Sequence, residues 1–320
     1  RSTLFPYTTL FRSSSKRRIN LYQFLAVMFL LIALGMFLRA TKVFPRETAP
    51  LLNRFVLYLT FPCLIFRSLQ PAHLASELWK IPPLAYTLIS LVFLASYFLS
   101  SRLLHLKEET SVSLAMGAAF GNTAFLGYPF ISALLGEKGL PPAIFFDQMG
   151  NFLSTYTVGV LLCVYAQTKR LSARSLLEII KLPPFLAFLL AIITNGLTVP
   201  PFLWETINRL ADATVPLTMV AIGMSLSASH LFRNWKLLLS ASSIKLAALP
   251  LLFLVGTQFV SFSPLYQKVM VIQAATPTLM TSYTLASIYN LDSEFSSSVI
   301  FFTTFLSLLT LPLWGSFLHP

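Results

Sequence analysis

"MGAAFGNTAFLGYPFISALLG", residues 116–136, is apolar enough to lie in a membrane, yet it contains helix breakers. Gly121 and Pro129 disturb a helix, and Asn122 and Thr123 add polar side chains between them. Inside a bilayer, every backbone N–H and C=O group must be paired by protein or by water in a cavity. The stretch therefore predicts a membrane helix that is interrupted, with its open backbone ends received by other parts of the protein.

The composition of the whole chain is that of an integral membrane protein. Of 320 residues, 56% are hydrophobic and 11% are charged, and the mean hydropathy is +0.74. A soluble domain typically has about 25% charged residues. The length accommodates about ten helices of ~20 residues with short loops. We therefore predict an all-α polytopic membrane protein with ten transmembrane helices, near residues 19–38, 51–69, 83–104, 111–135, 141–166, 182–199, 206–228, 236–260, 265–289 and 295–317.

The net charge of +12 does not indicate a nucleic-acid partner. The basic residues fall in short segments between apolar runs, as expected of residues that anchor helices on the cytoplasmic side of a bilayer. Cys63 and Cys163 lie inside apolar runs and match no metal-ligand spacing. The sequence predicts the lipid bilayer as the surroundings of the chain, no nucleic acid as a partner, and neither a metal nor a cofactor.

An internal repeat relates the two halves of the chain. Pro62 and Pro216 lie in similar apolar stretches, 154 positions apart, and the same offset aligns Asn122 with Thr276. It therefore lays "FGNTAFLGYP" of the fourth predicted helix on "AATPTLMTSY" of the ninth. Five crossings are an odd number, so the second half enters the bilayer from the opposite side. We predict two inverted five-helix repeats, with helices 4 and 9 broken and crossing: a first repeat at 19–166, a cytoplasmic loop at 167–181 and a second repeat at 182–320.

The distribution of basic residues predicts the orientation. The loops after odd-numbered helices, with the adjoining helix ends, hold twelve basic residues: Arg39, Lys42, Arg46, Arg54, Arg102, Lys107, Lys169, Arg170, Arg174, Lys181, Arg233 and Lys236. The opposite side holds five: Arg67, Lys80, Lys138, Arg209 and Lys268. The first side is therefore predicted to be cytoplasmic, with both termini extracytoplasmic, in a plasma membrane of the bacterial inner-membrane type. Residues 1–18 resemble translated cloning sequence, so we expect a non-native, disordered tail there and leave it out of the count.

The two predicted breaks indicate a binding site near the middle of the bilayer. Pro277 lacks an N–H group and clashes with the preceding turn, which ends a helix near Ala275. The N-terminus of a half-helix carries partial positive charge and favours an anionic ligand. A single proline often does no more than kink a membrane helix, but two breaks related by one offset favour a site. The candidate binding residues at the breaks are Gly121, Asn122, Thr123, Thr276, Pro277, Thr278 and Ser282.

Two ionisable residues fall inside predicted helices. Asp147 shares a helix face with Asn151, and it either binds a proton or cation or pairs with a nearby base. Lys245 either balances the charge of an anionic substrate, or extends to the membrane surface, or pairs with a carboxylate. Both are therefore candidates for ion or proton coupling, with these alternatives left open.

Three stretches resemble the auxin efflux carrier family of membrane transport proteins: "NRFVLYLTFPCLIFRSL", "GNTAFLGYPFISALLG" and the segment from "VIQAATPTLMTSYT" to "LSLLTLPL". That family includes plant auxin exporters and bacterial permeases of malonate, malate and similar acids, and the short loop at 167–181 is of the bacterial type. The resemblance implies crossed broken helices, a scaffold part and a moving part that work by an elevator-like motion. It also implies that Asn122 and Pro277 are crossover residues and that Gln148 and Asn151 contribute to the pocket.

The leading functional prediction is a secondary transporter of a small organic anion such as a carboxylate. A sodium-coupled symporter of bile-acid-like or other organic anions on a related fold is the alternative. The sequence has no P-loop, and its four histidines lie in predicted loops or at the end of the chain, which argues against an ATP-driven pump or an intramembrane enzyme. Monomer and homodimer both remain open.

Overall fold

The computed structural model describes residues 21–45, 47–168, 183–225 and 235–318. All regular elements within these ranges are helices, apart from one isolated pair of bridged residues, Gly121 and Thr278. By length and composition, five helical stretches are able to cross a membrane: Thr48–Leu69, Ser76–Leu103, Glu137–Gln167, Trp235–Gly256 and Ser293–Phe317. The all-helical membrane architecture predicted from composition is confirmed to this extent. The predicted tail at 1–18, and the predicted loop at 167–181 beyond residue 168, lie outside the described residues.

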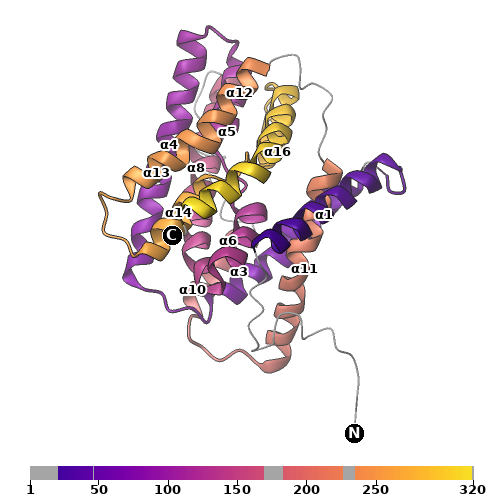
Figure 1. Ribbon diagram of the computed structural model, residues 1–320, viewed down its shortest axis with the longest axis vertical. Helices are drawn as coiled ribbons and strands as arrows, with labels where there is room; N and C mark the ends of the chain where they lie inside the picture. The colour runs from indigo at the N-terminus through magenta and orange to yellow at the C-terminus, as the bar shows by residue number, and fades with distance from the viewer. Residues whose placement is uncertain (1–20, 46, 169–182, 226–234, 319–320) are drawn as a thin grey trace.

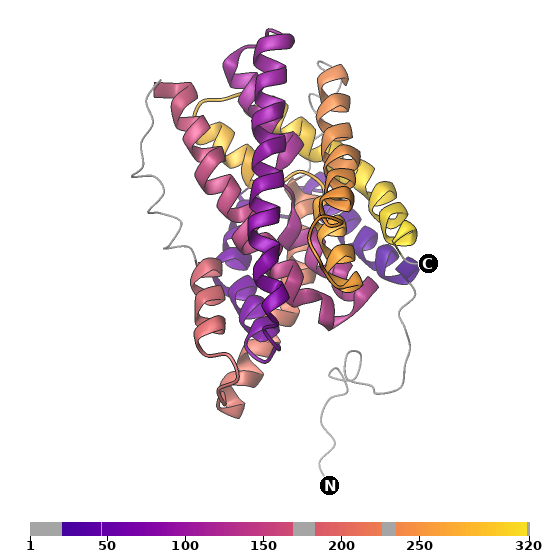
Figure 2. The ribbon, with the colours of Figure 1, turned by 90° about the vertical axis from the view of Figure 1, so that its left-hand side faces the viewer.

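The helices divide into two packed groups, which Figures 1 and 2 show from two directions. The first helix group consists of α1 (Leu21–Ala40), α2 (Thr48–Phe55), η2 (Val56–Thr60), α3 (Phe61–Leu69), α10 (Pro183–Ile193) and α11 (Pro201–Ser225). Within it, α11 packs along α1, α2 and α3, and α10 packs on α3. The helices at the start of the first half of the chain are thus packed with two helices at the start of the second half.

The second helix group contains the interrupted helices. It consists of η3 (Ser76–Lys80), α4 (Ile81–Phe98), η4 (Leu99–Leu103), α5 (Glu108–Ala119), η5 (Thr123–Gly127), α6 (Tyr128–Leu135), η6 (Glu137–Gly139), α7 (Leu140–Phe145), η7 (Phe146–Asn151), α8 (Phe152–Ser154), η8 (Thr155–Gly159), α9 (Val160–Thr168), α12 (Trp235–Ser243), η10 (Ile244–Ala248), α13 (Leu249–Gly256), α14 (Pro264–Ala274), α15 (Thr281–Ile288) and α16 (Ser293–Phe317). In this group α4 packs on α5 and η7, and α16 packs on α5 and α15. Contacts between the two groups are sparser than contacts within them.

Two glycines bring α1 and α11 into close contact in the first helix group. The Cα atom of Gly223 lies 2.9 Å from the position that a Cβ atom of Gly35 would take, and the same hypothetical atom would collide with the carbonyl oxygen of Val220. A Cβ atom on Gly223 would collide in turn with the carbonyl oxygen of Ile32. The absence of side chains at both positions therefore lets the two backbones touch, as small residues commonly do between membrane helices.

Several helices contain π-helical turns, in which the backbone bond spans five residues. Among them are η7, which carries Asp147, Gln148 and Asn151, and η10, which carries Lys245. Such turns occur frequently at functional sites, because the extra residue changes the direction of nearby side chains. Both ionisable residues singled out in the sequence therefore lie on π-helical turns.

Candidate functional site

The two interrupted helices meet through their backbones. α5 ends at Ala119 and the chain resumes as a helix at Thr123, while α14 ends at Ala274 and α15 begins at Thr281. The Asn122 N–H group donates to the Pro277 carbonyl at 2.7 Å, and the Leu279 N–H group donates to the Phe120 carbonyl at 2.9 Å. These bonds form a single antiparallel rung around Gly121 and Thr278. Each break therefore satisfies backbone groups of the other, which is what a dry membrane interior demands.

Threonine side chains complete the pairing on the side of the second break. Thr278 donates from its N–H group to Thr303 Oγ1 at 3.1 Å and from its hydroxyl to the Gly117 carbonyl at 2.6 Å. Thr276 donates its hydroxyl to the Gln273 carbonyl at 2.7 Å. Both side chains are fully buried, as is that of Ser282, whose hydroxyl has no partner among the described residues. The hydroxyls of Thr276 and Thr278 therefore stabilise the break itself.

Asn151 holds the first break open at a fixed geometry. Its Oδ1 atom accepts from the Gly121 N–H group at 2.9 Å, and its Nδ2 group donates to the Gly121 carbonyl at 2.9 Å. The same Nδ2 group donates to Thr123 Oγ1 at 3.1 Å. One side-chain amide thus replaces the helical partners that Gly121 loses where α5 ends.

Asp147 lies beside the start of the half-helix that follows the first break. Its carboxylate accepts from the Thr123 hydroxyl, from the Tyr128 hydroxyl at 2.8 Å and from Gln148 Nε2 at 2.8 Å. Its exposed fraction is 5%. The three donors are neutral, and no base bonds to Asp147 within the described part of the chain. The structure therefore offers this carboxylate hydrogen bonds and a helix N-terminus instead of an ion pair.

Lys245 lies on the other side of the crossing. Its side chain is fully buried, and Nζ donates to the carbonyl of Ala274, the last residue of α14, at 2.6 Å. Nζ also lies 3.2 Å from the position that a Cβ atom of Gly121 would take. In the described residues it neither reaches the membrane surface nor bonds to a carboxylate, the two structural alternatives raised by the sequence.

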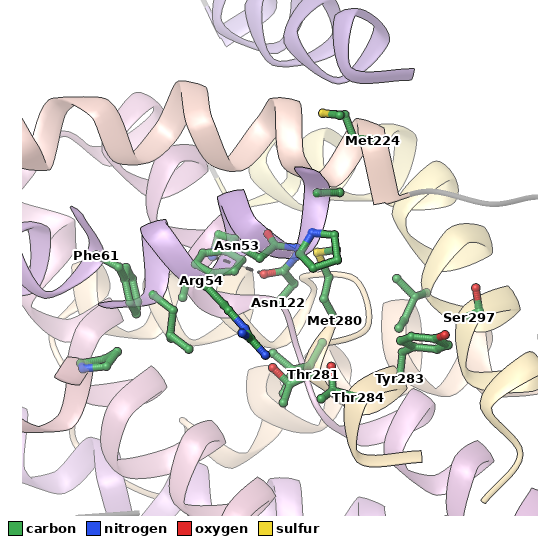
Figure 3. Close-up of a pocket in the computed structure, with 18 of the residues that line it drawn as sticks. Asn53, Arg54, Phe61, Asn122, Met224, Met280, Thr281, Tyr283, Thr284 and Ser297 are labelled. Carbon is green, nitrogen blue, oxygen red and sulfur yellow. Dashed lines mark hydrogen bonds between the residues drawn. The ribbon is translucent and has the colours of Figure 1, made fainter. Parts of the chain in front are cut away.

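A cavity of about 1260 Å³ lies between the two helix groups, and Asn122 of the first break is part of its lining. Its lining from the first helix group includes Arg39, Ala49, Pro50, Asn53, Arg54, Leu57, Tyr58, Phe61, Pro184 and Met224. Its lining from the second includes Asn122, Ala124, Phe125, Asp147, Gln148, Asn151, Phe152, Tyr156, Leu279, Met280, Thr281, Tyr283, Thr284, Ser293, Glu294, Ser297 and Ile300. Figure 3 shows Arg54 extending from α2 toward Thr281, with Asn122 and Met280 on the same side of the space.

The predicted binding residues separate into two sets. Asn122, Gln148 and Asn151 line the cavity, as does Asp147. The cavity lining does not include the other predicted binding residues, Gly121, Thr123, Thr276, Pro277, Thr278 and Ser282, or the predicted coupling residue Lys245. The first set faces the space in which a ligand fits, and the second forms or supports the crossing behind it.

Three buried polar atoms of cavity-lining residues lack partners among the described residues: Asn53 Oδ1, Asn122 Nδ2 and Gln148 Oε1. Asn122 Nδ2 and Gln148 Oε1 make no hydrogen bond among the described residues, although each side chain is only 1% exposed. An unpaired buried polar group costs about 1–3 kcal/mol, so both atoms are ready to bind a ligand or water. The cavity can therefore both donate and accept hydrogen bonds beside the break.

Sequence reasoning missed the contribution of the first helix group to this cavity. Arg54 enters the prediction only as a topology-determining charge, and Phe61, Met280 and Thr281 do not enter as site residues. One signal was available, because "NR" at positions 53–54 places an amide and a guanidinium inside the apolar run 51–69. The sequence does not indicate that this run lines one cavity together with residues 279–281 of the second break.

Comparison with known proteins gives a consistent set of relatives. Residues 21–315 match the family described as "Membrane transport protein". An uncharacterized transporter of Methanothermobacter thermautotrophicus is 34% identical over 288 residues, which cover 89% of this chain and 94% of the relative. An uncharacterized transporter of Methanocaldococcus jannaschii is 29% identical over 299 residues, 90% of this chain and 96% of the relative. A Rhizobium meliloti protein named "Putative malonate transporter" is 25% identical over 292 residues, 88% of this chain and 90% of the relative.

Proposed function

Because the chain belongs to the membrane transport protein family, we propose that it is a secondary transporter that carries a small organic anion through the cavity beside the crossed helices. The family and the relatives are transporters rather than enzymes, and the chain is a multi-pass membrane protein. The observation that carries the proposal is the unpaired Asn122 Nδ2 group, buried in the lining of a cavity that Arg54 also enters. A donor and a guanidinium together match a carboxylate.

The start of α15 adds positive electrostatic potential to the same cavity. Met280 and Thr281 line the cavity, and their backbone N–H groups donate to no other group in the described part of the chain. The first turn of α15 contains no acidic residue, and no side chain caps it. A helix N-terminus without an acidic neighbour attracts an anion. We therefore propose that the ligand carboxylate binds between Asn122, Arg54 and the first turn of α15.

The charge of Asp147 restricts how that anion binds. Asp147 lines the same cavity as Arg54, and like charges repel strongly in a poorly hydrated interior. An anion therefore binds more readily when the Asp147 carboxylate is protonated or screened. We propose that Asp147 couples the anion to a proton.

A sodium-coupled symporter of organic anions is the second candidate. The buried Asp147 carboxylate beside the Thr123 hydroxyl supports it, because oxygen atoms are the ligands that a small cation requires. Replacing sodium by choline during uptake distinguishes the two candidates.

We propose that the transmembrane organisation is that of two inverted five-helix repeats, with boundaries at 19–166 and 182–320. The offset of 154 positions that relates Pro62 to Pro216 also relates the two breaks, which supports this arrangement. In the predicted orientation, one part of the cavity lining lies on the cytoplasmic side of the membrane. This part includes Arg39, Lys42 and Glu294. The cavity then represents an inward-open state in a plasma membrane, with both termini outside.

We propose an elevator-like motion as the transport step. The second helix group carries the break, Asp147 and Asn151, whereas the first helix group contributes one wall of the cavity. Sparse contacts between the groups allow one to slide past the other while the crossing stays intact. The same two-group arrangement would operate in a monomer or in each protomer of a homodimer.

Uptake into proteoliposomes tests the proposed function. The purified protein is reconstituted and offered radiolabelled malonate, the acid in the name of the Rhizobium meliloti relative, together with other mono- and dicarboxylates. We expect saturable uptake of at least one acid, with a sharply raised apparent KM in Asn122→Ala. Uptake of no acid above that of empty liposomes, with wild type and Asn122→Ala indistinguishable, contradicts the proposal.

A further inference from the structure

Four helix ends converge at the crossing, and their partial charges differ. α5 and α14 end there, so each presents the negative end of its dipole, whereas η5 and α15 begin there with the positive end. Asp147 lies at the start of η5, through its bonds to Thr123 and Tyr128. Lys245 lies at the end of α14, through its bond to Ala274. Asp147 thus places a negative charge at the positive end of one helix, and Lys245 places a positive charge at the negative end of another.

The surroundings of Lys245 are those of a bound cation rather than those of an ion pair. Nζ is fully buried, donates to the Ala274 carbonyl at 2.6 Å and lies against Gly121, two residues beyond the end of α5. The elements packed against η10 are α5, α12, α13 and α16. Their acidic residues within the described ranges are Glu108, Glu109 and Glu294, all in the first turns of α5 and α16 and therefore distant from the break. Buried charge is costly unless it is compensated, and here the Ala274 carbonyl at the C-terminus of α14 provides the hydrogen bond to the ammonium group.

The π-helical turn η10 fixes the ammonium in this position. Within it, the Leu246 carbonyl accepts from Trp314 Nε1 at 2.9 Å, which pairs a backbone group with α16. This bond joins η10 to a neighbouring helix while the side chain of Lys245 extends toward the breaks. The placement depends on a specific contact and not on a flexible chain end.

We propose that the ammonium group of Lys245 is a built-in substitute for a monovalent cation at the negative ends of α5 and α14. The protein therefore requires no sodium or potassium ion at this point of the crossing. Removing the ammonium leaves a small buried space lined by carbonyl oxygen, which a free monovalent cation can then occupy. The inference goes beyond the proposed function, because it concerns the folded protein and holds whatever the transported anion is.

Thermal unfolding of purified variants tests this inference without any transport measurement. Wild type, Lys245→Ala and Lys245→Met are heated in sodium, potassium, lithium or choline chloride at one ionic strength. Lys236→Ala removes an exposed lysine from the adjacent α12 and serves as the control. We expect equal Tm values in all four salts for wild type and Lys236→Ala. For Lys245→Ala we expect a lowered Tm in choline and a saturable increase with at least one of the three small cations, because a ligand bound only to the folded state stabilises it.

Three results would overturn the proposal. One is a Lys245→Ala protein whose Tm is the same in choline and in each small cation. Another is a Lys245→Met protein as stable as wild type in choline, since it lacks the charge but keeps the length of the side chain. The third is failure of both variants to fold in every salt, because a small cation should restore the structure. Since none of these measurements uses an anion, they are independent of the uptake assay.

Discussion

The side-chain amide of Asn151 pairs with both backbone groups of Gly121, at 2.9 Å each, from a helix that is 30 positions away in the chain. Gly121 lies where α5 has ended and η5 has not begun, so it has no helical partner of its own. The interruption is therefore built by two parts of the sequence, one that breaks the helix and one that pairs the freed groups.

Asn151→Leu should destabilise the protein while leaving the helices around it in place. The change leaves the Gly121 N–H group buried and unpaired, at a cost of about 1–3 kcal/mol. The Gly121 carbonyl keeps only its long bond from the Thr123 hydroxyl, at 3.4 Å. Thermal unfolding in detergent measures the loss. Gln258→Ala, which removes an exposed amide that bonds only the Leu254 carbonyl, is the control and should leave Tm nearly unchanged. Equal Tm values for Asn151→Leu and wild type would show that the amide is dispensable.

Arg54→Ala should weaken anion binding without affecting folding. A hydrogen bond to a charged group contributes about 1.5–3 kcal/mol, so the apparent KM for the transported acid should rise roughly 10- to 100-fold. Arg102→Ala, which removes an exposed arginine of η4 that does not line the cavity, is the matched control. If both variants change KM by the same factor, Arg54 contributes only general surface charge.

Asp147→Asn should remove a repulsive charge from the cavity. We expect the variant to bind the anion more tightly than wild type at neutral pH, because the carboxylate no longer opposes it. Lowering the pH protonates the wild-type carboxylate, so wild-type affinity should rise toward that of the variant, whereas the variant should stay constant. Binding measured across pH 5 to 8 by thermal shift tests this. A pH dependence that persists in Asp147→Asn would assign the coupling to another group.

Gly35→Val should disrupt the contact between α1 and α11. The added side chain would collide with the Val220 carbonyl and with the backbone of Gly223. Forcing extra atoms into a packed contact costs about 1–3 kcal/mol, and backbone leaves little room for relaxation. Fluorescence-detected size-exclusion chromatography after heating measures the loss. The control is Leu34→Ala, at an exposed position of the same helix, which should be as heat-stable as wild type. If Gly35→Val is also as heat-stable as wild type, the protein does not need the close contact between the two helices.

The elevator-like motion should stop when the two helix groups are tied together. The rings of Phe61 in α3 and Phe125 in η5 lie 5.6 Å apart across the boundary between the groups. With both replaced by cysteine and the native cysteines removed, a short bis-methanethiosulfonate, which joins two thiols through disulfide bonds, should block uptake, and a reductant that cleaves those bonds should restore it. The pair Phe66 and Trp204, 6.4 Å apart within the first helix group, is the control and should tolerate the same bridge. Continued uptake with Phe61 and Phe125 bridged would exclude sliding of the groups.

Much of the framework is predictable from sequence because the relevant signals are local. Pro277 and the Gly121–Asn122 pair interrupt their own helices, and helices occupy the predicted apolar runs within the described residues. The offset between the halves also points to the pairing of the two breaks, which the bond between Asn122 and Pro277 realises.

What the sequence leaves undetermined depends on contacts between distant segments. No pattern in the neighbouring sequence indicates that Lys245 donates a hydrogen bond to the Ala274 carbonyl, or that the Thr278 hydroxyl donates one to the Gly117 carbonyl. The same holds for Arg54, whose role depends on its lying across the cavity from residues of the second break. These placements follow from the three-dimensional packing of helix on helix, which one sequence does not encode in any readable pattern.

The π-helical turns have a consequence for how such a protein can change over evolutionary time. One residue corresponds to about 100° of rotation in a helix with 3.6 residues per turn. Deleting a single residue from η7 would convert the turn to regular helix without rotating the helices on either side, because a π-helical turn holds one residue more than an α-helical turn. The side chains within the turn, which include Asp147, Gln148 and Asn151, would change direction, although no other amino acid of the site had been replaced. In this chain, insertions and deletions of one residue are thus a route to altered selectivity that a comparison of matched positions alone would overlook.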